Sequence, residues 1–200
     1  MRITESDSFK RITVRPGGYY VTDQPTIIST LLGSCVSACL YDPIRRVAGM
    51  NHFLLSNRRY AKNMPLSITE AGRYGIQAME LLINAMLKMG AQRENIHAKA
   101  FGGGSVIPLV SKRDNFLCVG EVNVRFIREF LKNDGIPLVM ADLGGERGRV
   151  IHFVSGNDYS VYVRKIKRIL SQKLVSREKK FWIKSIAAQE RAETETDIWL

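Results

Sequence analysis

The sequence has few of the residues that carry redox and metal chemistry, with three cysteines and three histidines among 200 residues. Three cysteines cannot all pair with one another, so the sequence does not predict a domain built on a disulfide framework. A chain of this length buries roughly two thirds of the surface of its unfolded state and needs no covalent cross-links. We therefore expect free thiols in a reducing compartment.

Long apolar runs are also absent. No stretch approaches the roughly 20 apolar residues of a membrane-spanning helix. The first residues, MRITESDSFKRITVRPGG, lack the apolar core of a secretory signal. With 45% hydrophobic and 24% charged residues, the composition is that of an ordinary globular protein. We expect a cytoplasmic protein without direct membrane insertion.

Acidic residues are scarce in one segment near the C-terminus. Residues 164–184 contain nine lysines and arginines but only one acid, Glu178, which places +8 of the net charge of +11 there. Apolar residues recur through the segment, which predicts a basic amphipathic helix followed by a frayed end. We therefore divide the chain into a domain over 1–166 and a basic C-terminal extension over 167–200. The extension could dock on an acidic partner, or its charges could simply form the solvated face of a helix. Residues 164–180 have no aromatic residues among the basic ones, which argues against nucleic acid.

Hydrophobic periodicity predicts the order strands, helix, strand, helix, strand, hairpin. Residues 69–89 and 121–134 have apolar side chains at helical spacing, and a glycine follows each. Between 96 and 142, the strand–helix–strand order predicts a right-handed crossover. The fold class is therefore α/β (α+β), with two main helices and at least one mixed sheet. The predicted strands lie near 10–21, 26–32, 35–41, 47–55, 95–101, 136–142, 148–154 and 159–166.

One cysteine and one histidine lie on consecutive predicted strands. In a hairpin, the numbers of paired residues have a constant sum. A turn centred on Pro43 and Ile44 gives a sum of 87, and Cys35 and His52 have the same sum. The two side chains would then lie directly opposite each other, with Cβ atoms about 4.5–5.5 Å apart. A four-residue loop at 42–45 preserves this register, whereas an odd loop length would not.

A thiol beside an imidazole is the arrangement of a cysteine nucleophile. The thiolate is the reactive form, and a neighbouring histidinium favours it. Gly33 permits a bend just before the cysteine, so that backbone amides near Ser34 could face a developing oxyanion. Ser29 or Thr30 could orient the histidine through a hydroxyl, as the third member of a catalytic triad does. Two ordinary core neighbours would have the same spacing.

The other cysteines and histidines are better interpreted as structural. A zinc site would need Cys39 and Cys118 beside the thiol and imidazole of the hairpin. However, Cys35 and Cys39 would lie about 13 Å apart along one strand at roughly 3.3 Å per residue, too far to share an ion. Small buried thiols and hydrogen-bonded core histidines, here including His97 and His152, are common in proteins. We expect no metal.

The run FGGGS at 101–105 follows a predicted strand, as phosphate-binding loops do. It lacks the Gly-Lys-Ser/Thr ending of such a loop. Its glycines are expected to let the backbone approach the hairpin or a substrate closely.

Several motifs together resemble one known family. The segments LGSCVSACLYDP (32–43) and GMNHFLL (49–55) resemble the signature of the chemoreceptor glutamine deamidases, the CheD family. Further similar segments are AKAFGGGS (98–105), VGEVN (119–123) and DLGGERGR (142–149). The similarity covers about residues 10–166 and does not reach the basic extension.

The resemblance implies a three-layer α/β sandwich that hydrolyses glutamine side-chain amides to glutamate on methyl-accepting chemotaxis receptors, without metal or cofactor. The family's catalytic cysteine and histidine fall on Cys35 and His52. Its threonine, six positions before the cysteine, falls on Ser29, and Thr30 is next to it. Both residues carry a hydroxyl, so the third catalytic residue stays open between them.

Further site residues and partners follow from the same interpretation. Gly33 and Ser34 are expected to support the oxyanion, and Gly102, Gly103 and Asn123 to bind substrate. The substrate partner would be the cytoplasmic helices of chemoreceptors. An alternative function is that of a non-catalytic regulatory module that binds a CheC-type phosphatase, which the resemblance also implies as a partner.

Overall fold

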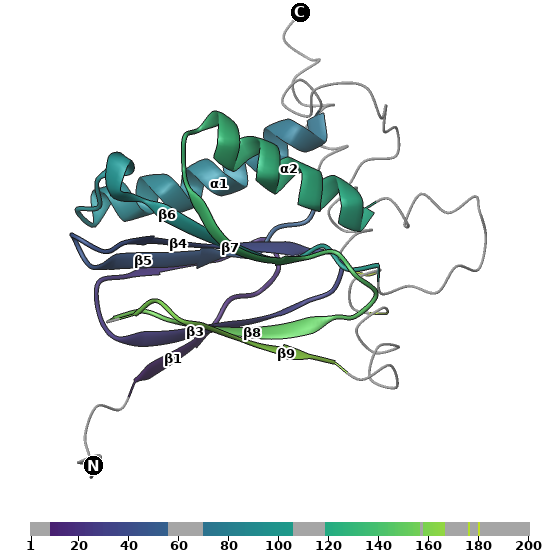
Figure 1. Cartoon of the computed structure of the whole chain (residues 1–200), viewed down its shortest axis with the longest axis horizontal. Helices are drawn as coiled ribbons and strands as arrows, with labels where there is room; N and C mark the ends of the chain where they lie inside the picture. Colours follow the sequence, from purple (N-terminus) through teal and green to yellow (C-terminus); the bar gives the residue numbers. More distant parts are fainter. Residues whose placement is uncertain are drawn as a thin grey trace, which may run out of the picture.

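The computed structural model describes residues 9–55, 70–105, 119–156 and 158–166, together with Ser176 and Lys180. In this part of the chain, nine strands form two sheets, and the helices lie over one of them (Figure 1). The layers are therefore helices, sheet and sheet. The three-layer sandwich and its two main helices are confirmed.

Both sheets are mixed. The middle layer has the strand order β2-β5-β4-β6-β7, and the outer layer has the order β1-β3-β8-β9. Strands β6 and β7 are parallel, as are β1 and β3, and the other neighbouring pairs are antiparallel. The strands are β1 Lys10–Thr13, β2 Tyr19–Thr22, β3 Thr26–Leu32, β4 Val36–Asp42, β5 Val47–Asn51, β6 His97–Gly102, β7 Leu138–Leu143, β8 Arg149–Val154 and β9 Val161–Lys165.

The two long helices begin and end close to the predicted residues. Helix α1 spans Glu70–Lys88 and helix α2 spans Val119–Asn133, and a short 3-10 helix, η2, spans Arg93–Asn95. Gly90 and Gly135 follow the α-helices with φ of 98° and 69°. This left-handed conformation closes a helix C-terminus at little cost in glycine. The predicted helices, the parallel strands on either side of α2 and the β8–β9 hairpin are all confirmed.

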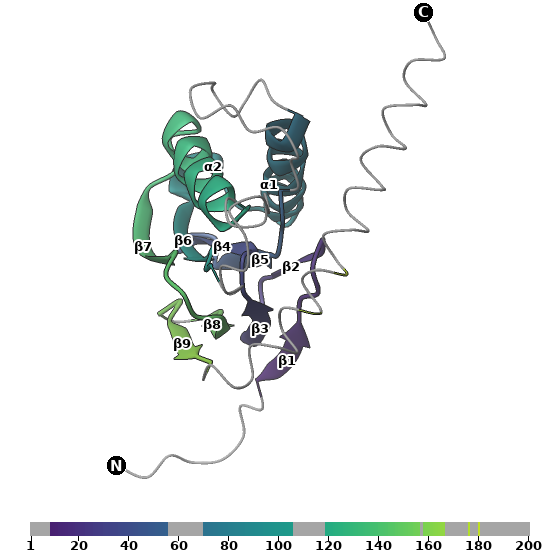
Figure 2. The same ribbon diagram turned by 90° about the vertical axis from the view of Figure 1, so that its right-hand side faces the viewer.

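Figure 2 shows the three layers from the side, and two cores of buried side chains hold them together. Met79 and Ile83 of α1 and Ile127 of α2 pack on the five-stranded sheet. The second core lies between the sheets and includes Ile28 and Phe153, both fully buried. Burying side chains of this size stabilises the fold by about 1.5–3 kcal/mol each. The five-stranded sheet is therefore covered on both faces.

The hairpin with the candidate cysteine and histidine is present, but its predicted register is wrong. Strands β4 and β5 pair with a sum of 89, so that Asp42 lies opposite Val47. The loop is 43–46, one residue later than predicted. Buried Asp42 stays in the ladder, and its carboxylate accepts hydrogen bonds from the amides of Ile44 and Arg45, both at 2.9 Å. This turn therefore shifts the pairing by two residues.

The corrected register changes how Cys35 and His52 face each other. An isolated bridge between Val36 and Phe53 continues the sum of 89 beyond the ladder. A shift of two residues conserves the face on which each side chain lies. Cys35 and His52 therefore share a face but are diagonal neighbours instead of a directly opposed pair.

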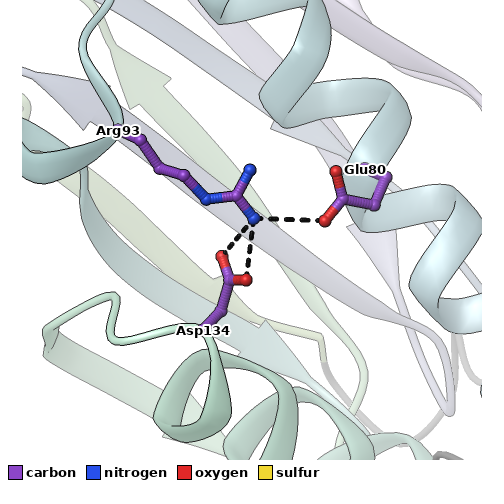
Figure 3. Close-up of polar contacts among 3 residues, drawn as sticks. All are labelled: Glu80, Arg93 and Asp134. Carbon is purple, nitrogen blue, oxygen red and sulfur yellow. Dashed lines mark hydrogen bonds and ion pairs between the residues drawn. The ribbon is translucent and has the colours of Figure 1, made fainter.

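An ion-pair cluster connects the middle of α1 with the C-terminal end of α2 (Figure 3). The Arg93 guanidinium lies 3.2 Å from the Glu80 carboxylate of α1 and 2.7 Å from the carboxylate of Asp134, which follows α2. The arginine side chain is 41% exposed, and exposed ion pairs of this kind contribute about 1 kcal/mol or less. The cluster thus links the two helices but contributes little to the stability of the fold.

The remaining predictions concern the C-terminal extension and membrane insertion. The basic amphipathic helix and the domain boundary at 166–167 lie outside the described residues. In the described part of the chain, no helix combines the length and the hydropathy that a membrane crossing requires.

We predict that Gly75→Ala destabilises the protein, although alanine is the better helix former by about 1 kcal/mol. A Cβ at this position of α1 would lie 2.5 Å from the ring of Phe126, which is buried against Phe53 and Phe130. The expected net loss is about 1–3 kcal/mol, as for other overpacked sites, measured by urea unfolding. In a Phe126→Leu background the same change should be neutral or stabilising. A gain in stability with Phe126 intact would contradict this packing.

Candidate active site

The candidate nucleophile lies where the chain passes from one sheet to the other. Strand β3 ends at Leu32 in the four-stranded sheet, and β4 begins at Val36 in the five-stranded sheet. We call the connecting residues 33–35 the crossing segment. Cys35, its last residue, is 2% exposed and packs in the core between the sheets.

Three consecutive carbonyls of the crossing segment accept hydrogen bonds. Those of Cys35 and Gly33 accept from the backbone amides of 103 and 104, respectively, each at 2.7 Å. The carbonyl between them, that of Ser34, accepts from Asn123 Nδ2 at 3.0 Å. A trans peptide is planar, and its N–H points opposite to its C=O. These bonds therefore also fix the directions of the amide N–H groups of residues 34 and 35.

Glycine is required where the run at 102–104 meets the crossing segment. Gly102 has a φ of 109°, and a Cβ there would lie 2.1 Å from the carbonyl oxygen of Cys35. Gly103 has a φ of 66°, and its Cβ would lie 2.3 Å from a methyl group of Val124. The expected close approach to the hairpin is confirmed. A role of Gly102 and Gly103 in substrate binding stays a prediction.

Asn123 links helix α2 to both sides of the site. Its side chain is fully buried, and its amide nitrogen donates to the carbonyls of Ser34 at 3.0 Å and Val119 at 2.9 Å. Its amide oxygen accepts a hydrogen bond from Leu55 N at 2.8 Å. Both amide hydrogens are thus used within the protein. These contacts give Asn123 a positioning role, and substrate binding by it stays a prediction.

Thr30 holds the imidazole of His52 from the opposite sheet. Thr30 Oγ1 lies 2.7 Å from His52 Nδ1, and it also donates a hydrogen bond to the carbonyl of Val14 at 2.8 Å. A hydroxyl has one hydrogen. If that hydrogen goes to Val14, the threonine oxygen is left to accept from Nδ1–H. The geometry thus predicts that neutral His52 carries its proton on Nδ1 and presents Nε2 as a base.

Ser29 faces the other way. Side chains along β3 are alternately buried and half-buried, with Thr30 facing the core between the sheets and Ser29 the outer face. There Ser29 Oγ lies 2.7 Å from Nδ1 of His152, its partner on β8. Adjacent strand residues point to opposite faces, so only one of the two hydroxyls reaches His52.

Asn51 interrupts the β4–β5 ladder just before His52. Its side-chain oxygen accepts a hydrogen bond from Ala38 N at 2.9 Å, in place of a backbone carbonyl. The backbone of His52 instead pairs with the β1–β2 turn, accepting from Gly17 N at 2.7 Å and donating to Gly18 O at 3.0 Å. The histidine is therefore held by both sheets. An asparagine inside an apolar strand run was the only sequence signal of this arrangement.

The remaining cysteines and histidines take structural positions where they are described. Complete burial raises the pKa of the Cys39 thiol, so it stays protonated and inert. His97 donates from Nδ1 to the carbonyl of Asn95 at 3.0 Å and stacks on the ring of Tyr41. Cys118 lies outside the described residues.

A pocket of about 210 Å³ borders His52, between the β1–β2 turn and α1. Exposed Tyr19 and Leu81 form part of its rim. Its lining residues are Gly17, Gly18, Tyr19, Asn51, His52, Phe53, Tyr74, Gln77, Ala78 and Leu81.

The arrangement is suited to acyl transfer by a thiol. A buried cysteine with a fixed backbone shares a face with an imidazole, and a hydroxyl orients that imidazole. Nucleophile, base and orienting group are the three components of a catalytic triad.

Comparisons with known proteins point in the same direction. A family model described as CheD chemotactic sensory transduction matches residues 54–165. The Probable chemoreceptor glutamine deamidase CheD 1 of Geobacter sulfurreducens is 54% identical over 189 residues, 94% of each chain. The Probable chemoreceptor glutamine deamidase CheD 2 of Shewanella oneidensis is 49% identical, over 76% of this chain and 74% of its own.

Among solved structures, one of the Bacillus licheniformis hypothetical protein YfiH aligns with 62% of this chain and 49% of its own. Its TM-score is 0.36 and its identity is 18%. That likeness is too low to carry an argument.

We predict that neutral His52 is protonated at Nδ1 and not at Nε2, because Thr30 accepts a hydrogen bond from Nδ1. Two-dimensional NMR of ¹⁵N-labelled protein, correlating the ring nitrogens with the ring carbon-bound protons, distinguishes the two tautomers. Thr30→Val removes the acceptor and should mix them. His97 serves as the internal control, since its Nδ1–H bond to a carbonyl is untouched. Protonation of His52 at Nε2 in the unchanged protein would overturn the assignment.

Proposed function

The chain belongs to the CheD family, and from this premise we propose that Cys35, His52 and Thr30 form the catalytic triad of a chemoreceptor glutamine deamidase. The protein hydrolyses the side-chain amide of receptor glutamines to glutamate. The observation that carries the assignment is the Thr30–His52 hydrogen bond, because it leaves Nε2 as the basic nitrogen of the imidazole.

The first half of the reaction forms a thioester. His52 Nε2 takes the proton from Cys35 Sγ, and the thiolate attacks Cδ of the glutamine side chain. The C–N bond then breaks, and the histidinium gives its proton to the departing nitrogen, which leaves as ammonia. An amide nitrogen is a poor leaving group until it is protonated, so the same imidazole must act first as base and then as acid.

The second half releases glutamate. His52 takes a proton from water, and the hydroxide attacks the thioester carbonyl. The C–S bond breaks, the thiol regains its proton, and the carboxylate departs. No metal or cofactor enters either half of this scheme.

The crossing segment supplies the proposed oxyanion support. The carbonyls of Gly33 and Ser34 are fixed by hydrogen bonds, so the amide N–H groups of Ser34 and Cys35 are fixed in the opposite directions. Donors that are oriented before the reaction lower the cost of charge development on the attacked carbonyl oxygen. We propose these two amides as the oxyanion donors.

We assign the third catalytic role to Thr30 and not to Ser29. The family spacing points to Ser29, but its hydroxyl lies against His152 on the outer face of the sheet. Thr30 is 3% exposed and bonds to the imidazole of the site. The orienting hydroxyl thus lies five residues before the cysteine in this chain.

The receptor substrate also bears on where the protein works. Receptor glutamines that the enzyme modifies lie on cytoplasmic helices, so we propose a cytoplasmic location. Binding to a CheC-type phosphatase stays a prediction, as does a docking role for the basic extension at 167–200. Both would survive loss of the thiol, which separates them from catalysis.

We predict that Cys35→Ala abolishes deamidation, with a fall in rate of at least about 1,000-fold. The assay is mass mapping of a receptor cytoplasmic fragment, in which each converted glutamine gains one mass unit. Cys39→Ala is the matched control, since Cys39 is a buried and inert thiol on the same hairpin. The proposed function fails if Cys35→Ala leaves the rate unchanged.

The choice of third residue gives a separate prediction. Thr30→Val keeps the shape but leaves the Nδ1–H of His52 without its acceptor, so kcat should fall about 100-fold or more. Thr30→Ser should retain most of the activity, and Ser29→Ala should change kcat by less than about threefold. Initial rates of ammonia release at saturating receptor fragment measure all three. A large loss in Ser29→Ala with an active Thr30→Val would return the role to Ser29.

A further inference from the structure

A buried arginine outside the triad is connected to the nucleophile through backbone hydrogen bonds. Arg149 is the first residue of β8 and is 2% exposed. It is paired in register with Leu32, the residue before the crossing segment. Its side chain, however, reaches to the five-stranded sheet, where it contacts the end of β7.

The guanidinium organises the loop that follows β7. It donates hydrogen bonds to the carbonyls of Asp142, Gly144 and Arg147, and it lies 2.8 Å from the carboxylate of Asp142. Three carbonyls, one from the end of β7 and two from the loop after it, converge on a single planar group. The fork geometry of arginine suits this task, and a lysine ammonium cannot reproduce it.

The charge of Arg149 is balanced where it is buried. Burial lowers the pKa of its guanidinium, and the Asp142 carboxylate raises it again. Arginine stays protonated under such conditions. A buried cation is tolerated only when it is paired and hydrogen-bonded, so this side chain and the loop fix each other.

The loop in turn holds the glycine run. Gly144 N donates to the carbonyl of Gly102 at 2.8 Å, and Ser105 N donates to the carbonyl of Gly145 at 2.7 Å. A Cβ at Gly104 would lie 3.1 Å from the carbonyl oxygen of Arg147. The glycine run is thus in close contact with the loop on one side and with the crossing segment on the other.

We propose that Arg149 is a positioning residue for the deamidation reaction, acting through the 142–147 loop and the 102–105 run on the backbone of Cys35. The proposal rests on the proposed function. Arg149 touches neither the thiol nor the imidazole, and its effect is transmitted by the bonds from 103 and 104 to Cys35 and Gly33. It also joins the sheet that carries Thr30 to the sheet that carries His52.

The test separates positioning from stability by using Arg149→Lys and Asp142→Asn. The lysine variant keeps the positive charge but loses the planar guanidinium that donates to several carbonyls at once. The asparagine variant keeps an acceptor beside Arg149 and removes the ion pair at a side chain that is 33% exposed, so it is expected to fold. Phe153→Leu is the matched control. Phe153 is a buried core residue on the same strand, and it takes no part in the series of hydrogen bonds from Arg149 to Cys35.

Two measurements are made on each folded variant. The first is kcat and KM for deamidation of a receptor cytoplasmic fragment, corrected for the folded fraction. We expect kcat to fall about 10- to 100-fold in Arg149→Lys, with a smaller fall in Asp142→Asn and little change in KM, because small displacements of a reacting group have effects of this size. Phe153→Leu should lower Tm without lowering kcat.

The second measurement needs no receptor. Iodoacetamide labelling of Cys35, followed by mass spectrometry of its peptide, gives the pH profile of thiol reactivity. In Arg149→Lys and Asp142→Asn we expect this profile to move to higher pH, because a displaced thiol couples less well to His52. The Phe153→Leu profile should match that of the unchanged protein.

The outcomes test the positioning role of Arg149 separately from the proposed deamidase function. Suppose that the unchanged protein deamidates receptors while Arg149→Lys and Asp142→Asn keep its kcat and its labelling profile. The positioning role of Arg149 is then wrong, and the proposed deamidase function is unaffected. A fall in kcat matched by Phe153→Leu at equal loss of Tm also overturns it. If the unchanged protein releases no ammonia, the proposed function fails, and the labelling profiles still decide whether Arg149 positions Cys35.

Discussion

The site depends on the planarity of the peptides in the crossing segment. Three successive carbonyls, at residues 33–35, each accept a hydrogen bond from a group that belongs to another element. Since a trans peptide cannot turn its carbonyl without turning its amide, these bonds orient both the nucleophile and the proposed oxyanion donors. The donors come from residues 103 and 104, where a Cβ would clash, and from the buried side chain of Asn123.

The active residues come from both sheets, so their geometry depends on how the sheets are stacked. Thr30 belongs to the outer sheet, and His52 and Cys35 adjoin strands of the middle sheet. A small sliding of one sheet would lengthen the 2.7 Å bond between Thr30 and His52. Close-packed interiors resist such sliding, and the bonds of Arg149 between the sheets oppose it at the same end of the sandwich. The stacking of the two sheets thus keeps Thr30 and His52 at hydrogen-bonding distance.

Sequence reasoning predicted what depends on local periodicity. Helices and strands were found because apolar side chains repeat at 3.6 or 2 residues, and glycines mark where helices end. The hairpin register was wrong by two residues because Asp42 stays in the ladder while its carboxylate holds the loop. The prediction that Cys35 and His52 share a face was still correct, because a shift of two residues leaves each side chain on the same face of the sheet.

Contacts between segments that are distant in the chain could not be predicted from the sequence. The run TIISTLL is apolar on both faces, so its pattern could not say whether Ser29 or Thr30 points inward. Asn123 lies 89 residues from Ser34. The connection from Arg149 to Cys35 passes through three segments of the chain. No periodicity records such contacts, because they depend on the way in which the elements pack.

The neutral hydroxyl of Thr30 has a consequence for the chemistry of His52. A carboxylate in that place would stabilise the imidazolium strongly and raise its pKa. Thr30 instead accepts from Nδ1–H while donating to the carbonyl of Val14, so the imidazole is held by a chain of dipoles. Such a chain orients the imidazole in both halves of the reaction without the charge–charge stabilisation that would make the histidinium a weaker acid. The departing ammonia needs that acidity, because it leaves only when His52 gives up its proton.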